Sequence, residues 1–386
     1  MNILYTFSSP HGDVPVDDAT LARPFIVRPF ENHPFMTLGD YFLAIRDLIL
    51  SEDGRPLTTL LSRLWTRNAA IADVDTIFIR YEKYGTLYHI SSAEIVAGAR
   101  RTRLTVSAAV TDESKEALDR EFGVLQRLGS QKSLSYLPQV CCKHAVQIRK
   151  AEGSETLLMT LSEWFDNYHE WHFSHDGEGR QRIIVWDMES GYRFMSEQET
   201  YEIIRQAATI LTFYYDTETY NRIFPWHHGA GDFVVKSAEG AIDLKLVTAR
   251  GYEPVAVPEH DPETGPSRAI ILFFLETTVK MRLDKYEGMG ESIWADAFVV
   301  GAAVDGFFRA LRLKESEGHA FAIKVNDLMK QLKGFTEDEL KRLLHAHMNQ
   351  VGSRDSSDYA AISSHTDDHA RDLYHAIQEQ VKTKAG

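Results

Sequence analysis

Apolar residues recur at helical spacing in two stretches near the start of the chain. TLGDYFLAIRDLIL, which begins at Thr37, and LTTLLSRLWTRNA, which begins at Leu57, each place apolar side chains on one face of a helix. The preceding residues, from Met1 to Pro34, are rich in proline, aspartate and histidine and show no such period. The pattern therefore predicts an irregular start followed by two helices.

From Val74 the pattern becomes typical of strands. DTIFIRYEKYGTLYHISSAEIV consists of β-branched and aromatic runs broken by Gly85, and RLTVSAAV alternates between apolar and polar positions. An amphipathic helix is predicted from Asp112 to Leu128, followed by strands in YLPQVCCKHAVQI and ETLLMTLSEWF. This order of three strands, a helix and two strands predicts a mostly antiparallel sheet over Thr76 to Phe165, with the helix packed on it.

The second half of the chain is expected to be mainly helical. QRIIVWD indicates a small hairpin, and Ser196 with Glu199 forms a capping box before a helix that reaches Tyr215. DFVV and IDLKLVTA indicate two short strands, and helical patterns dominate after Ser267. A connector rich in serine and aspartate, from Gly352 to Ser364, precedes the last predicted helix.

These patterns define a fold class and a division of the chain. The 386 residues exceed the roughly 250–300 residues at which a single hydrophobic core stops growing. We expect an α+β protein with a partly helical N-terminal extension (residues 1–73), a small β-rich lobe (residues 74–165) and a larger, mainly helical lobe (residues 166–386).

Charge and cysteine content exclude several classes of function. The formal net charge is −14, from 42 basic and 56 acidic residues, which disfavours nucleic acid and anionic membrane surfaces as partners. The only cysteines, Cys141 and Cys142, are adjacent and cannot form a disulfide framework of spaced pairs. The first residues do not resemble a signal peptide, and no apolar run is long enough to span a membrane. We therefore expect a cytoplasmic protein, whose oligomeric state the sequence leaves open.

The densest candidate chemistry lies in the stretch NRIFPWHHGAGDFVV. It places His227, His228 and Asp232 on a loop loosened by glycine, between a long helix and a hairpin. His227 could accept a proton near neutral pH, and Asp232 could hold Mg²⁺ through a carboxylate oxygen. The alternative is a tight corner, in which the histidines bond to backbone carbonyls and Asp232 caps the turn.

The order of elements from Thr76 to Leu313 resembles the protein-kinase-like fold, especially its aminoglycoside and choline phosphotransferase branch. The resemblance implies a two-lobed protein that binds ATP and Mg²⁺ and acts on a small-molecule acceptor. It places Gly85 in a turn over the phosphates and Glu121 at the glutamate of the small-lobe helix. It also places Glu163 and Trp164 in the segment between the lobes, where backbone groups would face an adenine ring.

The same resemblance assigns roles to the loop and shows where this chain departs from the family. Asp232 occupies the position of a metal-binding asparagine, and His227, five residues earlier, replaces the catalytic aspartate. The third strand contains no lysine, and Arg103 is the only cation near that position. Asp243 is the nearest candidate for the second metal-binding aspartate but comes too early in its strand.

Three hypotheses follow from these residues. The first is a small-molecule phosphotransferase with altered chemistry, in which His227 is the base and Asp232 holds Mg²⁺. The second is a pseudoenzyme that binds a nucleotide or a partner protein. The third is a metal-dependent hydrolase of another fold that uses His227, His228 and Asp232.

Two other groups of residues have alternative interpretations. His169, His172 and His175 have a spacing that could suit zinc, but on a hairpin strand they would not converge. Glu121, on an apolar helix face, could instead form a structural ion pair with Arg103 or Lys143.

Overall fold

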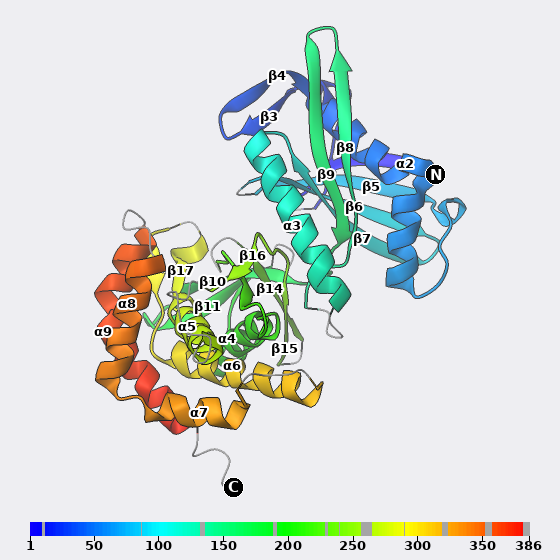
Figure 1. Cartoon of the computed structure of the whole chain (residues 1–386). Coiled ribbons are helices and arrows are strands. Elements are labelled where there is room, and N and C mark those ends of the chain that lie inside the picture. Colours follow the sequence, from blue (N-terminus) through cyan, green and yellow to red (C-terminus); the bar gives the residue numbers. More distant parts are fainter. Residues whose placement is uncertain are drawn as a thin grey trace. The chain divides into compact units, whose positions relative to one another are not determined.

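The computed structural model divides the chain into two compact units. The first comprises Met1–Asn167, and the second comprises Tyr168–Asp187 together with Gly191–Gly386. The structure describes residues 1–9, 12–85, 87–131, 136–187, 191–227, 231–238, 240–255, 265–288, 290–318, 323–351 and 357–380. The two units are described separately below, with the elements labelled as in Figure 1.

The first unit is built on one mixed sheet. The elements in chain order are β1 (Asn2–Phe7), β2 (Val14–Pro15), α1 (Asp18–Leu21), β3 (Pro24–Arg28), β4 (Glu31–Thr37), α2 (Leu38–Trp65), η1 (Ile71–Asp73), β5 (Thr76–Tyr84), β6 (His89–Ala97), β7 (Arg100–Ala109), α3 (Asp112–Gln131), β8 (Val140–Lys150) and β9 (Gly153–Glu163). The sheet has seven strands in the order β2-β1-β5-β6-β7-β9-β8. β1 and β5 run parallel, and every other neighbouring pair is antiparallel.

The predicted order of three strands, a helix and two strands is confirmed in β5, β6, β7, α3, β8 and β9. The amphipathic face of α3 buries Leu118, Phe122 and Leu125, because these positions recur at helical spacing. α3 contacts β7, β8 and β9, as Figure 1 shows, and so covers this part of the sheet.

The prediction of an irregular start from Met1 to Pro34 is wrong. β1 joins the central sheet beside β5, and β3 pairs with β4 as a hairpin. The pattern was missed because β1 is short and its partner strand lies about seventy residues away, so its stability comes from tertiary pairing rather than local sequence. Residues 1–73 therefore belong to the same compact unit as the strands that follow.

The two helices predicted near the start are confirmed as the two segments of α2, which a kink separates. Ser51 has an extended ψ of 149°, and Glu52, Asp53 and Gly54 have positive φ values of 50°, 57° and 77°, so the helix is interrupted there. Pro56 follows at the start of the second helical segment, where its missing N–H is tolerated. Both segments contribute buried leucine and isoleucine side chains to the core of the first unit.

The second unit combines a sheet with six helices among its described residues. The elements are β10 (His169–His175), β11 (Gln181–Asp187), β12 (Gly191–Phe194), α4 (Glu197–Phe213), β13 (Asn221–Ile223), β14 (Phe233–Ala238), β15 (Ala241–Leu246), β16 (Tyr252–Pro254), α5 (Gly265–Lys280), β17 (Leu283–Lys285), η3 (Tyr286–Gly288), β18 (Ser292–Trp294), α6 (Phe298–Ser316), α7 (Val325–Gly334), α8 (Glu337–Val351) and α9 (Ser357–Glu379). A five-stranded antiparallel sheet has the order β12-β11-β10-β14-β15, and β13 pairs with β16 in a separate two-stranded sheet.

Several predictions for this unit are confirmed, and two boundaries are corrected. The Ser196–Glu199 capping box begins α4, and the two strands after the loop form the β14–β15 hairpin. α9 begins at Ser357, inside the predicted connector, because serine and aspartate also suit the first turn of a helix. The helix predicted from the pattern IWADAFVVGAAVDGFFRALRL, α6, begins at Phe298 rather than Ile293, because Ile293 pairs in β18.

The α+β fold class is confirmed by the sheets and helices of the two units. In the described part of the chain, no helix has the length and apolar character needed to cross a membrane.

Candidate functional site

The loop between β13 and β14 carries most of the predicted chemistry. Phe224 begins the loop beside Gly251, whose carbonyl oxygen accepts a hydrogen bond from the Phe224 N–H at 3.1 Å. A Cβ atom on residue 251 would lie 2.4 Å from the carbonyl oxygen of Phe224, so only glycine permits this approach. The loop is thus held against the segment that leads into β16.

Asp232 lies at the end of this loop and is buried, with 1% of its surface exposed. Arg250 donates to both carboxylate oxygens, with Nη1 to Oδ2 and Nη2 to Oδ1 both at 2.5 Å. The backbone N–H of His227 donates to Oδ2 at 2.8 Å. Asp232 therefore closes the loop onto His227 and ties it to Arg250.

This arrangement bears on the expected metal role of Asp232. A bidentate arginine matches the geometry of a carboxylate and already neutralises its charge. A magnesium ion would have to displace Arg250 to reach these oxygens. The structure therefore favours the tight-corner interpretation of this aspartate over the metal-ligand interpretation.

His227 is half-buried and lies in a field of several charges. Burial lowers the pKa of its imidazole, and the Lys280 and Arg250 charges act in the same direction, whereas Asp232 and Asp358 oppose them. The ring is therefore mainly neutral at pH 7, the state in which it can accept a proton. His228, its predicted neighbour in the site, lies outside the described residues.

Lys280, at the end of α5, is a cation near His227 that the sequence did not suggest. Its ammonium group lies over the rings of Phe224 at 4.7 Å and Trp226 at 5.4 Å. Burial lowers the pKa of the Lys280 amine, and the charge of Glu276 partly opposes this. Within the described ranges the ammonium has no hydrogen bond and no carboxylate within ion-pair distance, so these aromatic rings are its main contacts.

A buried ion pair also contacts Phe224, whose ring centroid lies 4.3 Å from the Arg222 guanidinium. Arg222 contacts Glu276 through Nε at 2.9 Å and Nη2 at 3.2 Å, and both residues are at most 5% exposed. Burial alone would raise the pKa of Glu276, but His347 and Arg222 lower it below its usual value. Because His347 is 3.9 Å away, too far for a hydrogen bond, Arg222 is the partner that holds the carboxylate ionised.

Asp243, the other predicted metal ligand, lies apart from Asp232. It is on β15 opposite Lys236, and Tyr168 donates to its Oδ2 at 2.5 Å. Val247, whose N–H bonds to the carbonyl of Asp232, is four residues further along, or about 13 Å at the usual strand rise. The two carboxylates are too far apart to share one ion at the ~2.1 Å that Mg²⁺ requires.

Two predicted nucleotide-binding residues come together in the first unit. Gly85 is in the β5–β6 turn, where its N–H bonds to the carbonyl of Tyr88 at 2.9 Å. The Tyr88 hydroxyl donates to the carboxylate of Glu121, a buried residue of α3. Of the alternative partners expected for Glu121, Lys143 pairs with Asp119 and Arg103 lies 3.8 Å from Glu94.

Arg103 and Glu163 also lie close together, across the β7–β9 ladder, where Glu163 is paired with Leu104. The Arg103 guanidinium lies over the Trp164 ring at 5.4 Å. The backbone groups of Glu163 already have partners, since its N–H bonds to Gln139 at 2.9 Å and its carbonyl accepts from Thr105 at 3.2 Å. An adenine ring would have to replace these contacts to use the same groups.

The three regularly spaced histidines do not converge. They lie on β10, where residues three apart point to opposite faces of the sheet. His172 is buried 3.8 Å from Asp284, whereas His175 stacks on Tyr286. Among the residues that the structure describes, no group of three metal-binding side chains is present.

Arg250, Lys280 and the Arg222–Glu276 pair were missed in the sequence. Glu276 and Lys280 interrupt the apolar run AIILFFLETTVKMRL four residues apart, which is a visible signal of buried charge. Arg250 carries no such signal, because only the fold brings it to Asp232.

Comparison with protein-family descriptions and with curated proteins gives no match to this chain, so the site rests on its own geometry.

Proposed function

We propose that this chain is a kinase-like pseudoenzyme that binds a nucleotide without magnesium and transfers no phosphoryl group. The observation that carries the proposal is the buried bidentate contact between Arg250 and Asp232. An arginine side chain occupies the place at this carboxylate that the kinase-like interpretation gives to a metal ion.

The order of the elements supports the kinase-like part of the proposal. Three antiparallel strands, α3 and two further strands are followed by α4, the loop at His227 and the β14–β15 hairpin. This is the order from which the resemblance was drawn, and the two-lobed arrangement is part of what we propose.

The missing groups support the pseudoenzyme part. Phosphoryl transfer depends on positioning and on neutralisation of charge by metal ions, a lysine and a base. β7 contains no lysine, and its Arg103 faces Glu94. Asp243 is held at the surface by Tyr168 and lies far from Asp232. Arg250 is paired with Asp232, so Lys280 is the cation near the loop that could attract a phosphate without a metal ion.

A second candidate, an active phosphotransferase with His227 as the base, is favoured by one observation. The pKa of His227 is lowered by burial and by Lys280, which keeps the ring neutral and able to accept a proton. The metal-dependent hydrolase requires His227, His228 and Asp232 around one ion. The Asp232 carboxylate is already paired with Arg250, which disfavours this candidate.

A transfer assay separates the first two candidates. ATP labelled on its γ-phosphate is incubated with Mg²⁺, the protein and a panel of small alcohols and aminoglycosides. The pseudoenzyme proposal expects no labelled product with the wild-type protein or with His227→Gln. Transfer that disappears in His227→Gln, with a wild-type rate that rises with pH through the imidazole pKa, would replace it with the second candidate.

A further inference from the structure

The first unit contains a pocket beside the β5–β6 turn. It has a volume of ≈ 190 Å³ and is bounded by the end of β3, the β5–β6 turn and the first turn of α3. Its lining combines apolar and aromatic side chains with a few polar groups, including Arg28, His89 and Tyr88. This combination is typical of sites for small organic ligands.

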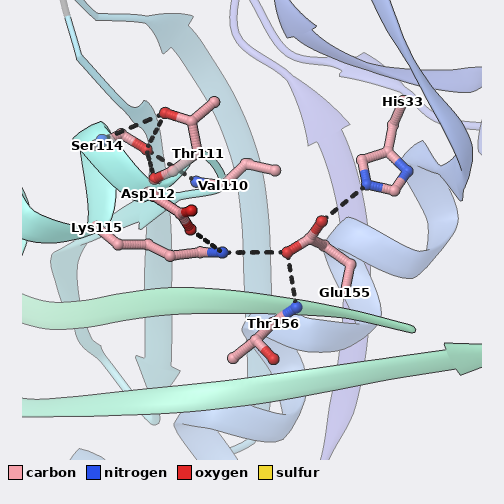
Figure 2. A network of polar contacts seen from close by, with 8 residues as sticks. All are labelled: His33, Val110, Thr111, Asp112, Ser114, Lys115, Glu155 and Thr156. Carbon is pink, nitrogen blue, oxygen red and sulfur yellow. Dashed lines mark hydrogen bonds and ion pairs between the residues drawn. The ribbon is translucent and has the colours of Figure 1, made fainter. Parts of the chain in front are cut away.

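The wall formed by α3 is held in place by a polar network (Figure 2). Lys115 contacts Glu155 of β9 at 3.1 Å, and the other oxygen of Glu155 lies 3.3 Å from Nε2 of His33 on β4. Nδ1 of His33 accepts from the N–H of Met36 at 3.0 Å, so Nε2 carries the proton and donates to Glu155. The network ties the start of α3 to two strands, which makes this wall rigid before any ligand binds.

The cap of the same helix is closed by its own residues. The Ser114 hydroxyl donates to the Thr111 carbonyl at 2.8 Å and accepts from the Val110 N–H at 3.1 Å, as Figure 2 shows. The Ser114 hydroxyl is therefore used within the helix start itself. The partial positive charge of the N-terminus of α3 remains directed at the region in front of that terminus.

His89 supplies a buried polar atom at this pocket. The residue is 1% exposed, and its Nδ1 lies 3.0 Å from the Tyr81 hydroxyl. Burial lowers the pKa of His89 to about 4, with the Val27 carbonyl opposing, and burial raises the pKa of Tyr81 to about 12. The tyrosine therefore keeps its proton, and in the tautomer in which it donates that proton to Nδ1 the imidazole proton lies on Nε2.

Nε2 of His89 makes no well-formed hydrogen bond among the described residues, although the backbone of Val27 lies close enough to act on the pKa of the ring. An unsatisfied buried donor is unfavourable by about 1–3 kcal/mol. A ligand atom that accepts this hydrogen bond in the pocket would remove that cost.

The charged groups at the pocket favour a negative ligand of single charge. Arg28 is half-exposed and only loosely paired with Glu113, at 3.6 Å. The guanidinium can turn to a ligand at little cost, because exposed ion pairs at this distance contribute less than about 1 kcal/mol. Glu113 also lines the pocket and would repel a doubly charged group such as a phosphate monoester.

We propose that this pocket binds a small monocarboxylate with an apolar body, a ligand other than the proposed nucleotide. Arg28 and the Nε2–H of His89 contact the carboxylate, and Tyr84, Leu87 and Tyr88 surround the apolar part. The size fits, because a cavity of about 150 Å³ accommodates one benzene ring.

Benzoate, benzamide and benzylamine are suitable probes, because they share one ring and differ in charge. Their binding to the full-length protein is measured by calorimetry and by shifts of the His89 ring signals in NMR spectra. We expect benzoate to bind at least about tenfold more tightly than the two others, since hydrogen bonds to a charged group exceed those to neutral groups. Equal binding of benzamide, stronger binding of benzylamine, or no benzoate binding would each overturn the proposal.

Two variants locate the site. Arg28→Gln should weaken benzoate binding about tenfold, whereas Arg23→Gln, a matched exposed arginine in the same segment, should leave it unchanged. Leu87→Trp should fill the pocket and abolish binding while the protein stays folded by circular dichroism. Unchanged affinity in both Arg28→Gln and Leu87→Trp would place any benzoate elsewhere and contradict the proposal.

Discussion

Arg250 donates two hydrogen bonds to the buried carboxylate of Asp232, from two nitrogens that each lie 2.5 Å from a different oxygen. The two residues are eighteen positions apart and come from opposite ends of the β14–β15 hairpin. Their contact fixes the loop that carries His227, because the same carboxylate also accepts the His227 N–H. The Asp232 carboxylate therefore has a structural role, because it holds the loop at His227 and the segment at Arg250 together.

Removal of Asp232 should therefore destabilise the fold. Asp232→Ala removes the buried carboxylate that pairs with Arg250, and we expect a loss of about 3–5 kcal/mol in the free energy of unfolding. Urea unfolding followed by circular dichroism measures this loss. The control is Asp243→Ala, at a half-exposed carboxylate, for which a loss of about 1 kcal/mol or less is expected. Similar small losses in both variants would show that Asp232 is not a structural link.

The pH dependence of stability should report the Arg222–Glu276 pair. The pKa of Glu276 is below its usual value in the folded state, because Arg222 and His347 together outweigh the effect of burial. The unfolded chain then binds the proton more tightly, so this stabilisation is present above about pH 4.5 and decreases as the pH falls below it.

Glu276→Gln tests whether the Arg222–Glu276 pair causes the loss of stability in acid. The variant should be less stable at pH 7 by about 3–5 kcal/mol, because Arg222 loses its charged partner, and its stability should change less between pH 5 and 3. Glu253→Gln, at an exposed position of β16, is the control and should retain the wild-type profile. A Glu276→Gln profile parallel to that of the wild type would contradict the prediction.

His89 should titrate far below an ordinary histidine. Burial lowers its pKa from 6.5 to about 4, so the folded protein resists protonation that the unfolded chain accepts. Stability from this residue is complete above about pH 6.5 and declines as the pH falls toward 4. NMR titration of the His89 ring protons, assigned with His89→Phe, measures the value directly, and a midpoint near 6.5 would contradict the burial described here.

Two glycines of α6 should respond in opposite directions to the same substitution. A Cβ on residue 306 would lie 2.2 Å from the carbonyl oxygen of Arg205 in α4, whereas one on residue 301 would meet nothing within 4 Å. Gly306→Ala should reduce the free energy of unfolding by about 1–3 kcal/mol, and Gly301→Ala should raise it by up to about 1 kcal/mol. Thermal and urea unfolding of the two variants tests the close packing of α4 on α6. Equal changes in the free energy of unfolding for both variants would contradict it.

Local signals made much of the fold predictable. The Ser196–Glu199 capping box and the amphipathic pattern around Phe122 depend on residues within a few positions of each other, and both helices are present. β1 was missed because its pairing with β5 depends on contacts between distant segments. Such contacts leave no period in the sequence of β1 itself.

The candidate site was less predictable for the same reason. His227 and Asp232 were expected on one short loop, and there the His227 N–H donates to Asp232. The partner of Asp232 was not, because Arg250 reaches it only after the intervening hairpin has folded. Lys280 interrupts an apolar run of the sequence, but only the folded loop brings Phe224 and Trp226 against it.

The most direct test of the central claim is thermal unfolding of the wild-type protein with ATP, measured once in EDTA and once in excess Mg²⁺. A ligand at one hundred times its dissociation constant stabilises the folded state by about 2.7 kcal/mol, enough to shift the midpoint measurably. The account predicts the same upward shift in both buffers, because Arg250 already neutralises Asp232. A shift that appears only with Mg²⁺, or no shift with ATP in either buffer, would contradict it.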